Sequence, residues 1–279
     1  AFARAAHLHG HGGRRVTHEK LCLSAFWRGM QRTTKEVCAA CVECARSKTR
    51  AATHHGTMRT FLVERPLQMV HIDLVGPFNP SSRGNKYVVT MKDRFSRFVV
   101  AEPIPNMTAE VVARAFLERW VAVLGLPERL VSDQGAQFCS GLFRALCARL
   151  QLGHSFTSPY HPQTNGSVER FHRDLKTRIG AFMREYGGDW EQYLSVVVWS
   201  SNSSVCVSTG YTPYEVMFGR EALQPFSRLA DERRLSAAAR ARVSVFDYTH
   251  AVADHLSRVH AEVRHRQARA AANNKQRYD

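Results

Sequence analysis

Acidic residues are scarce in this chain, and long apolar runs are missing. Its 279 residues hold 24 Asp and Glu against 39 Lys and Arg, which gives a formal net charge of +15 and a pI of about 10.0. Such an excess of positive charge favours a polyanionic partner, either nucleic acid or an anionic membrane surface. We find no apolar run that would span a bilayer, no secretory signal and no lipidation motif. We therefore expect a nucleic-acid partner and no membrane.

The chain also lacks the even number of cysteines that is typical of small secreted proteins held together by disulfides. It has seven cysteines, an odd number, and three of them lie within residues 38–44. This distribution fits a reducing compartment and metal binding better than a disulfide framework. The composition is otherwise that of a globular protein, with 44% hydrophobic and 23% charged residues. The length allows two or more modules with a sizeable core.

Histidines and cysteines near the N-terminus have the spacing of a zinc site. His7 and His11 are four positions apart, and Cys41 and Cys44 follow as a Cys-x2-Cys pair. Two imidazoles and two thiolates form the closed tetrahedral set of a structural zinc ion. The intervening apolar residues would build a small helical core that is too small to fold firmly without a metal. We predict a module over residues 1–50 that binds one structural Zn²⁺.

The spacing leaves two of the four ligands open. His9 competes with His7, because it also precedes His11 at short range. Cys38 competes with Cys44 as the partner of Cys41.

Three acids in the middle of the chain each stand at a regular element. Asp73 lies in the apolar string MVHIDLVGPF, where a charge is costly unless a metal or a partner accepts it. Asp133 follows the short strand pattern of RLVSDQGAQF, and Glu169 lies in the first turns of a helix in YHPQTNGSVERFHRDLK. Acids on two strands and a helix can converge on two divalent ions, and Mg²⁺ prefers such carboxylate oxygens.

These strings, together with KYVVTMKDRFSRFV and STGYTPYEVMFGRE, resemble the integrases of gypsy-class LTR retrotransposons, which are relatives of retroviral integrases. The similarity covers residues 7–225 and recurs weakly at 274–279. It implies a DDE-type integrase, a metal-dependent polynucleotidyl transferase that trims the 3′ ends of element DNA and joins them to target DNA. Asp73, Asp133 and Glu169 would be its catalytic residues and would hold two Mg²⁺ (or Mn²⁺) ions. The resemblance also favours Cys41 with Cys44, through VECARSK, and His11, through HGG.

Further expectations come from the resemblance alone. The partners would be double-stranded DNA, from the element ends and the target, further copies of the chain in a multimer, and a host chromatin tether. The location would be the nucleus, after a stage in a cytoplasmic particle. The chain would be a piece released from a polyprotein, and the small β-barrel domain with which this family normally ends would be absent. The alternative is a domesticated integrase-derived DNA-binding protein without catalysis.

The order of elements predicts an α/β protein with a ribonuclease-H-like catalytic core. We expect strands at 69–75, 86–92, 97–102, 129–132 and 154–157, which form a five-stranded mixed sheet with helices. The helix at 108–124 would begin at Thr108 and bury Val112, Phe116, Trp120 and Val123. The predicted division is a zinc-binding domain at 1–50, a linker at 51–67, the core at 68–225 and a basic helical extension at 226–279.

DNA contacts are predicted in three places. On a helix at 166–186, Glu169, Arg173 and Lys176 share a face that is distinct from the apolar stripe, so the two cations would hold phosphates near the acids. The loop at 160–166 precedes this helix and offers Tyr160 and Gln163, in a segment that touches DNA in the family. Basic residues at the start of the connector would follow the DNA backbone, as the resemblance implies: Arg46 and Lys48.

Overall fold

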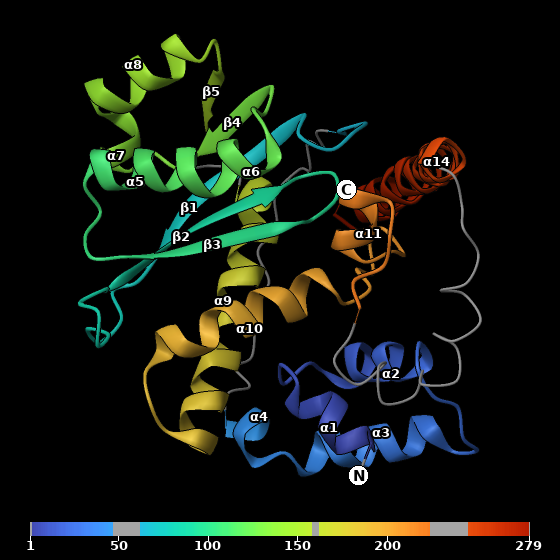
Figure 1. The fold of residues 1–279 in the computed structure, drawn as a ribbon. Coiled ribbons are helices and arrows are strands. Elements are labelled where there is room, and N and C mark those ends of the chain that lie inside the picture. The colour runs from blue at the N-terminus through green and yellow to red at the C-terminus, as the bar shows by residue number, and fades with distance from the viewer. Residues whose placement is uncertain (1, 47–61, 158–161, 224–244, 279) are drawn as a thin grey trace.

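The computed structural model describes residues 2–46, 62–157, 162–223 and 245–278 (Figure 1). The chain begins with a small helical module that has its own buried cluster. Leu21 is fully buried there, and Ala3, Ala6 and Met30 pack around it. The module consists of four helices: α1 (Phe2–Leu8), α2 (Arg14–Cys22), α3 (Met30–Ala40) and α4 (Val42–Arg46).

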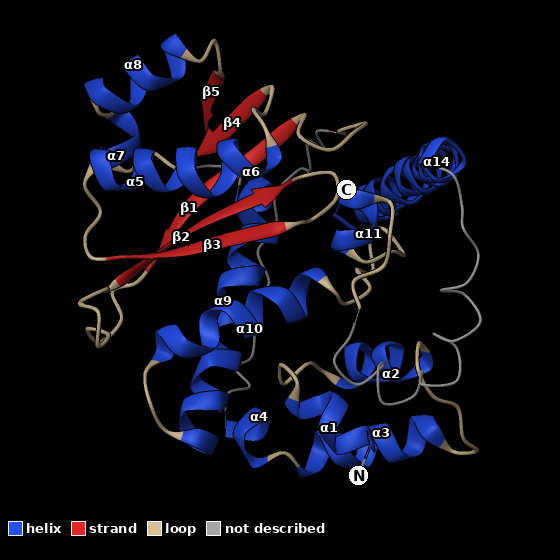
Figure 2. Ribbon diagram, viewed as in Figure 1, coloured by secondary structure: helices blue, strands red, loops and turns tan. Residues whose placement is uncertain are grey.

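A five-stranded mixed sheet follows, as predicted (Figure 2). The spatial order is β3-β2-β1-β4-β5, with antiparallel pairs β1–β2 and β2–β3 and parallel pairs β1–β4 and β4–β5. The first and fourth strands have the predicted bounds, and the other three are displaced by one or two residues. This is the ribonuclease-H-like arrangement. The strands are β1 (Met69–Val75), β2 (Tyr87–Asp93), β3 (Val99–Ile104), β4 (Arg129–Ser132) and β5 (Gly153–Phe156).

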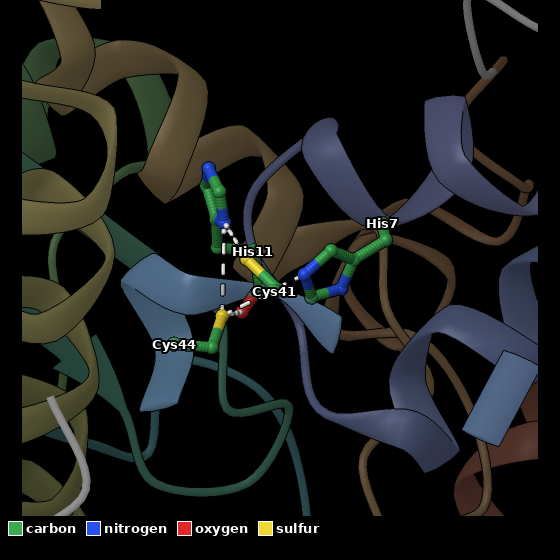
Figure 3. A group of neighbouring side chains, drawn as sticks. All are labelled: His7, His11, Cys41 and Cys44. Carbon is green, nitrogen blue, oxygen red and sulfur yellow. Dashed lines mark hydrogen bonds between the residues drawn. The ribbon is translucent and has the colours of Figure 1, made fainter. Parts of the chain in front are cut away.

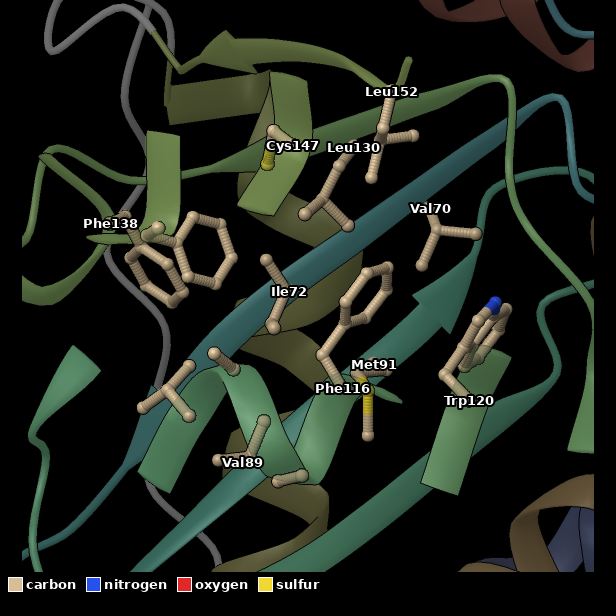
Figure 4. Close-up of a cluster of buried hydrophobic side chains, with 14 of the residues drawn as sticks. Val70, Ile72, Val89, Met91, Phe116, Trp120, Leu130, Phe138, Cys147 and Leu152 are labelled. Atoms are coloured by element: carbon tan, nitrogen blue, oxygen red, sulfur yellow. The ribbon is translucent and has the colours of Figure 1, made fainter. Parts of the chain in front are cut away.

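Helices cover both faces of the sheet. On one face, α5 (Ala109–Phe116), α7 (Ala136–Cys139) and α8 (Gly141–Arg149) enclose a cluster that includes Phe116 and Trp120 (Figure 4). On the other face, α9 (Pro162–Tyr186) and α10 (Trp190–Asn202) pack the apolar stripe of α9 against the sheet. The stripe is the predicted one, and all of its members are buried: Val168, Phe171, Leu175, Ile179 and Phe182.

The helix after β3 differs from the prediction in its last turn. Thr108 precedes α5, and Gly125 with φ of 96° ends the helix, both as expected. Val123, however, is 70% exposed. A π-helical turn, η1 (Leu117–Val121), lies between α5 and α6 (Ala122–Leu124). A π turn inserts an extra residue and rotates everything after it, so Val123 leaves the buried face that a regular helix would give it.

Helix α9 begins earlier than predicted. Its first residue is Pro162, so residues 162–166 belong to the helix and not to a loop. Proline suits the first helical position, because its φ is already helical and its missing N–H needs no partner there. Gly166 costs about 1 kcal/mol relative to alanine in a helix. The buried stripe that follows offsets this cost.

The C-terminal helix packs back onto the sheet domain. Helix α14 (Val245–Tyr278) buries Val259 and Val263 beside α11 (Pro213–Phe218) and Phe95. The Gln267 side-chain amide donates to the Phe95 carbonyl at 2.8 Å. The first part of the predicted basic extension, residues 226–244, lies outside the described residues. Among the helices that the structure describes, none is long and apolar enough to cross a membrane.

Candidate functional site

The predicted zinc ligands come together in the N-terminal module (Figure 3). His7 lies on α1. His11 lies in the turn after α1 and has a positive φ of 48°. Cys41 ends α3, and Cys44 lies on α4. One ligand atom from each of the four lies within 4.8 Å of the others. Within the described residues, this is the one group of three or more His, Cys, Asp or Glu side chains close enough to share a metal ion.

The two histidines present different ring nitrogens to the sulfurs. His7 Nδ1 lies 3.0 Å from the Gly12 carbonyl oxygen, and its Nε2 lies 3.6 Å from Cys44 Sγ. His11 Nδ1 lies 3.5 Å from Cys41 Sγ and 3.6 Å from Cys44 Sγ. Burial lowers the pKa of both rings, so they are neutral near pH 7 and each keeps a lone pair for a metal. Two neutral imidazoles and two thiols around one point fit zinc.

The geometry separates the alternatives that the spacing left open. The His9 ring packs edge-on against Trp199, with ring centroids 4.9 Å apart, and is not part of the cluster. Cys38 Sγ approaches His7 Nδ1 at 3.4 Å, on the side of the ring that also faces the Gly12 carbonyl. The cluster therefore contains His7 and Cys44.

The sheet brings the first two acids side by side, towards the carboxyl ends of two neighbouring strands. β1 and β4 are parallel, with His71 opposite Val131, so Asp73 and Asp133 each follow this pair by two residues. Backbone N–H groups orient both carboxylates. Leu74 N–H donates to Asp73 Oδ1 at 2.8 Å, and Gly135 N–H donates to Asp133 Oδ1 at 3.0 Å.

The third acid faces this edge from α9. Glu169 is exposed near the start of the helix. Burial, and then the negative charges of Asp133 and Glu169, raise the pKa of Asp73 to about 6 despite the hydrogen bond from Leu74. The three carboxylates thus share one electrostatic environment. Their oxygens do not form a second close metal-binding group among the described residues. Like-charged carboxylates repel one another, and hard oxygen donors of this kind suit Mg²⁺.

His172 belongs to the same environment and was missed by the sequence analysis. Its Nδ1 lies 3.8 Å from Asp73 Oδ2, and its Nε2 lies 2.7 Å from Thr90 Oγ1. The Thr90 hydroxyl donates to the Asp73 carbonyl at 3.2 Å. Burial, helped by Lys176 and Lys92, lowers the pKa of His172 to about 4, so the ring is neutral at pH 7. Its position, three residues after Glu169 on a helix, is the signal that would have found it.

The predicted DNA-contacting residues divide into two groups. Arg173 and Lys176 are exposed on α9, on the side that carries Glu169. The other four predictions fall outside the described residues, either completely or in their side chains: Tyr160, Gln163, Arg46 and Lys48. Asp93, another acid of this region, has a structural role, because its buried carboxylate accepts the backbone N–H groups of Leu67 and Ser96.

Comparisons with known proteins identify a domain family for each of the two regions. Residues 2–50 match the integrase zinc binding domain, and residues 63–162 match the integrase core domain. The chain is 29% identical over 216 residues to the retrovirus-related Pol polyprotein from transposon 412 of Drosophila melanogaster, which covers 77% of the chain and 18% of that polyprotein. It is also 29% identical over 248 residues to the Pro-Pol polyprotein of simian foamy virus type 3 (strain LK3). This match covers 86% of the chain and 21% of that polyprotein. The chain thus spans about a fifth of these relatives.

A solved structure supports the fold. The intasome of simian T-cell lymphotropic virus, in complex with PP2A regulatory subunit B56 gamma, contains a chain that is 21% identical with a TM-score of 0.53. The match covers 80% of this chain and 76% of that one. The chain therefore contains an integrase zinc binding domain followed by an integrase core domain, and it is similar to the Pol polyproteins of a retrotransposon and a retrovirus.

Proposed function

We propose that this chain is the integrase of a gypsy-class LTR retrotransposon, acting as a DDE-type polynucleotidyl transferase. It would trim the 3′ ends of the element's DNA and join them to target DNA. The observation that carries the proposal is the shared environment of Asp73, Asp133 and Glu169. They come from a strand, the end of a second strand and a helix, and their charges act together on the buried Asp73 carboxyl. The chain that carries these acids also matches the integrase core domain.

The three acids would hold two divalent ions, Mg²⁺ or Mn²⁺. When bound, such ions neutralise phosphate charge, activate the attacking oxygen and stabilise the leaving oxygen. The protein's part is to hold the carboxylates in register: Leu74 and Gly135 orient two of them through backbone N–H groups. His172 lies on the α9 side of Asp73, with its Nδ1 3.8 Å from Asp73 Oδ2. Trimming and joining need no different protein groups, since water attacks in the first and a 3′-hydroxyl in the second.

DNA would lie along the exposed side of α9. Arg173 and Lys176 follow Glu169 there and would hold backbone phosphates beside the reacting bond. The net charge of +15 supports binding to the phosphate backbone, which weakens as salt rises. Tyr160, Gln163, Arg46 and Lys48 are proposed as further DNA contacts on the strength of the resemblance.

His7, His11, Cys41 and Cys44 would hold one structural zinc ion. Two DNA ends must be held together for joining, so the active form would be a multimer on double-stranded DNA. The site of action would be the nucleus, with a chromatin tether as a further partner.

A strand-joining assay tests the proposal. The full chain is incubated with Mg²⁺, duplexes that carry the element's terminal sequence and a plasmid target. We expect joined product from the native chain and a loss on the order of 10³-fold or more with Asp133→Asn. The control is Glu110→Gln, which changes an exposed acid at the start of α5 and should leave joining unchanged.

Each result has a definite meaning. Equal joining by Asp133→Asn would overturn the assignment of the acids. Absence of product from the native chain, together with tight and salt-sensitive DNA binding, would favour the domesticated DNA-binding protein.

A further inference from the structure

The two histidines of the zinc cluster have outer partners from different parts of the chain. The outer nitrogen of His7 faces the Gly12 carbonyl, five residues away in the same module. The outer nitrogen of His11, Nε2, lies 3.0 Å from Glu185 Oε2. Glu185 is on the last turn of α9, the helix that packs against the sheet. The His11 side chain is fully buried, and the Glu185 side chain is 25% exposed.

The ring chemistry of His11 fixes what this contact does. Its Nδ1 faces two sulfurs, Cys41 Sγ and Cys44 Sγ, and is the nitrogen available to zinc. A metal-bound Nδ1 carries no proton, so the neutral ring carries its proton on Nε2, the nitrogen that lies 3.0 Å from Glu185 Oε2. A carboxylate that accepts this N–H fixes the orientation of the ring and makes the ligand nitrogen more basic.

Other contacts hold the zinc module against α9 and α10. The His11 ring packs edge-on against Phe182, one helical turn before Glu185, with centroids 5.0 Å apart. Arg184 forms an ion pair with Glu43 on α4 and donates to the Glu43 carbonyl at 3.0 Å. Farther along the same interface, the buried Lys20 ammonium donates to Ser200 Oγ on α10 at 2.8 Å. Helices α9 and α10 thus form the surface on which the zinc module rests.

We propose that Glu185 is a positioning residue of the zinc centre, supplied by the integrase core, so that zinc binding and docking of the N-terminal module onto α9 strengthen each other. The inference rests on the proposed zinc ligands and is independent of the proposed catalytic activity. Through Glu185, the core would become a part of the metal site. The isolated module would offer four ligands, whereas the docked module would offer the same four ligands with the His11 ring already oriented.

The test compares variants of the full 279-residue chain. The apparent Kd for Zn²⁺ is measured by competition with a chromophoric chelator, and the visible spectrum is recorded after Co²⁺ replaces zinc. Glu185→Gln keeps the size of the side chain and removes its charge. We expect the Zn²⁺ affinity to fall by roughly 10- to 100-fold, with a shift of the Co²⁺ bands, as for other outer partners of ligand histidines. Glu185→Ala should bind Zn²⁺ more weakly still.

Two control variants separate this role from simple docking. Glu102→Gln changes a carboxylate on β3 that is also 25% exposed and ion-paired, with Arg119, but distant from the cluster. It should bind Zn²⁺ as the native chain does. Arg184→Ala removes a docking contact without touching His11, and should change the affinity by about twofold and leave the Co²⁺ spectrum as it is.

The outcomes distinguish the two proposals on which the test depends. If the native chain binds one Zn²⁺ and Glu185→Gln matches it in both affinity and spectrum, the role of Glu185 is overturned. If Arg184→Ala shifts the spectrum as strongly as Glu185→Gln, docking alone explains the effect and the role is likewise overturned. If the native chain binds no Zn²⁺, the ligand set itself is wrong, whatever the joining assay gives.

Discussion

The histidine–cysteine cluster and the three acids differ in how much protein surrounds them. The zinc module packs its helices around Leu21 and a few small neighbours. The acids lie on a sheet and on the helix α9 that packs against it, and an extended apolar cluster covers each face of the sheet. The first site brings its four ligand atoms within 4.8 Å of one another, whereas the carboxylates form no group that close among the described residues.

This difference follows from what holds each site. In a small module, the ligands are part of the core, and binding energy for the metal is folding energy. In the larger domain, the apolar clusters hold the strands and helices, and the carboxylates remain at an edge where they repel one another. The first metal would be structural, and the second would be exchangeable. We expect changes at the two sites to reveal this contrast through effects that range from loss of a folded module to about 1 kcal/mol.

Removal of zinc should have the largest effect and should act on one region alone. Structural zinc supplies about 10–16 kcal/mol of apparent binding energy in zinc-finger peptides. We expect a strong chelator to unfold residues 2–46 and to leave the sheet domain folded. Circular dichroism with limited proteolysis would follow the two regions separately. Protection of residues 2–46 in the chelated, zinc-free protein would contradict the contrast.

A matched pair of core substitutions should sharpen the contrast. Leu21 in the zinc module and Leu130 in β4 are both fully buried. Each Leu→Ala change should cost about 2–5 kcal/mol, because it removes apolar contacts and leaves a cavity. For Leu130 this should lower the denaturation midpoint of the sheet domain. For Leu21 the same cost should appear as weaker Zn²⁺ binding, since folding and binding of the module are one process. Equal Zn²⁺ affinity in Leu21→Ala and the native chain would argue against this coupling.

Substitution of Asp73 should stabilise the metal-free protein. The pKa of Asp73 is raised to about 6 in the folded state, mainly by burial. A raised acid pKa means that its contribution to stability is present at low pH and is lost as pH rises towards 6. At pH 7 in EDTA, Asp73→Asn should therefore increase the free energy of unfolding by about 1–3 kcal/mol. Urea unfolding at pH 4 and pH 7 would measure it; an increase of equal size at both would refute the explanation.

The smallest effect should come from the histidine beside that acid. At pH 7, His172→Gln should cost about 1 kcal/mol or less, because it weakens one hydrogen bond, to Thr90. The pKa of His172 is lowered to about 4, so the folded state excludes the proton. Stability should rise with pH between about 4 and the ordinary value of 6.5, and the variant should show less of this rise. Unfolding midpoints across that range in EDTA would test it, with His250→Gln, an exposed position on α14, as the control.

Much of the fold was predictable because its elements carry local signals. β1 and β4 are short apolar runs between charges and turns, and both have the predicted bounds. The apolar stripe of α9 was visible at helical spacing, and so was the separate face with Arg173 and Lys176. Val123 was predicted wrongly because a π turn leaves no mark in the spacing of apolar residues.

The sites were predictable where residue types reveal chemistry. The zinc cluster could be proposed from His and Cys alone, although the choice of His7 over His9 required coordinates. The contact of Glu185 with His11 links positions far apart in the sequence, through the docking of two modules. A glutamate in the last turn of an amphipathic helix looks like an ordinary solvated residue. Only tertiary structure gives it a further role.

Helix α9 has a mechanical consequence. It is 25 residues long, or ~37 Å at 1.5 Å per residue. Glu169 lies near one end and Glu185 near the other, ~24 Å apart along the axis. One continuous helix joins them, braced by the buried Leu194 and Val197 of α10. A tilt of the N-terminal module would therefore be transmitted to Glu169 through one stiff helix, and would shift Glu169 relative to Asp73 and Asp133 at the sheet.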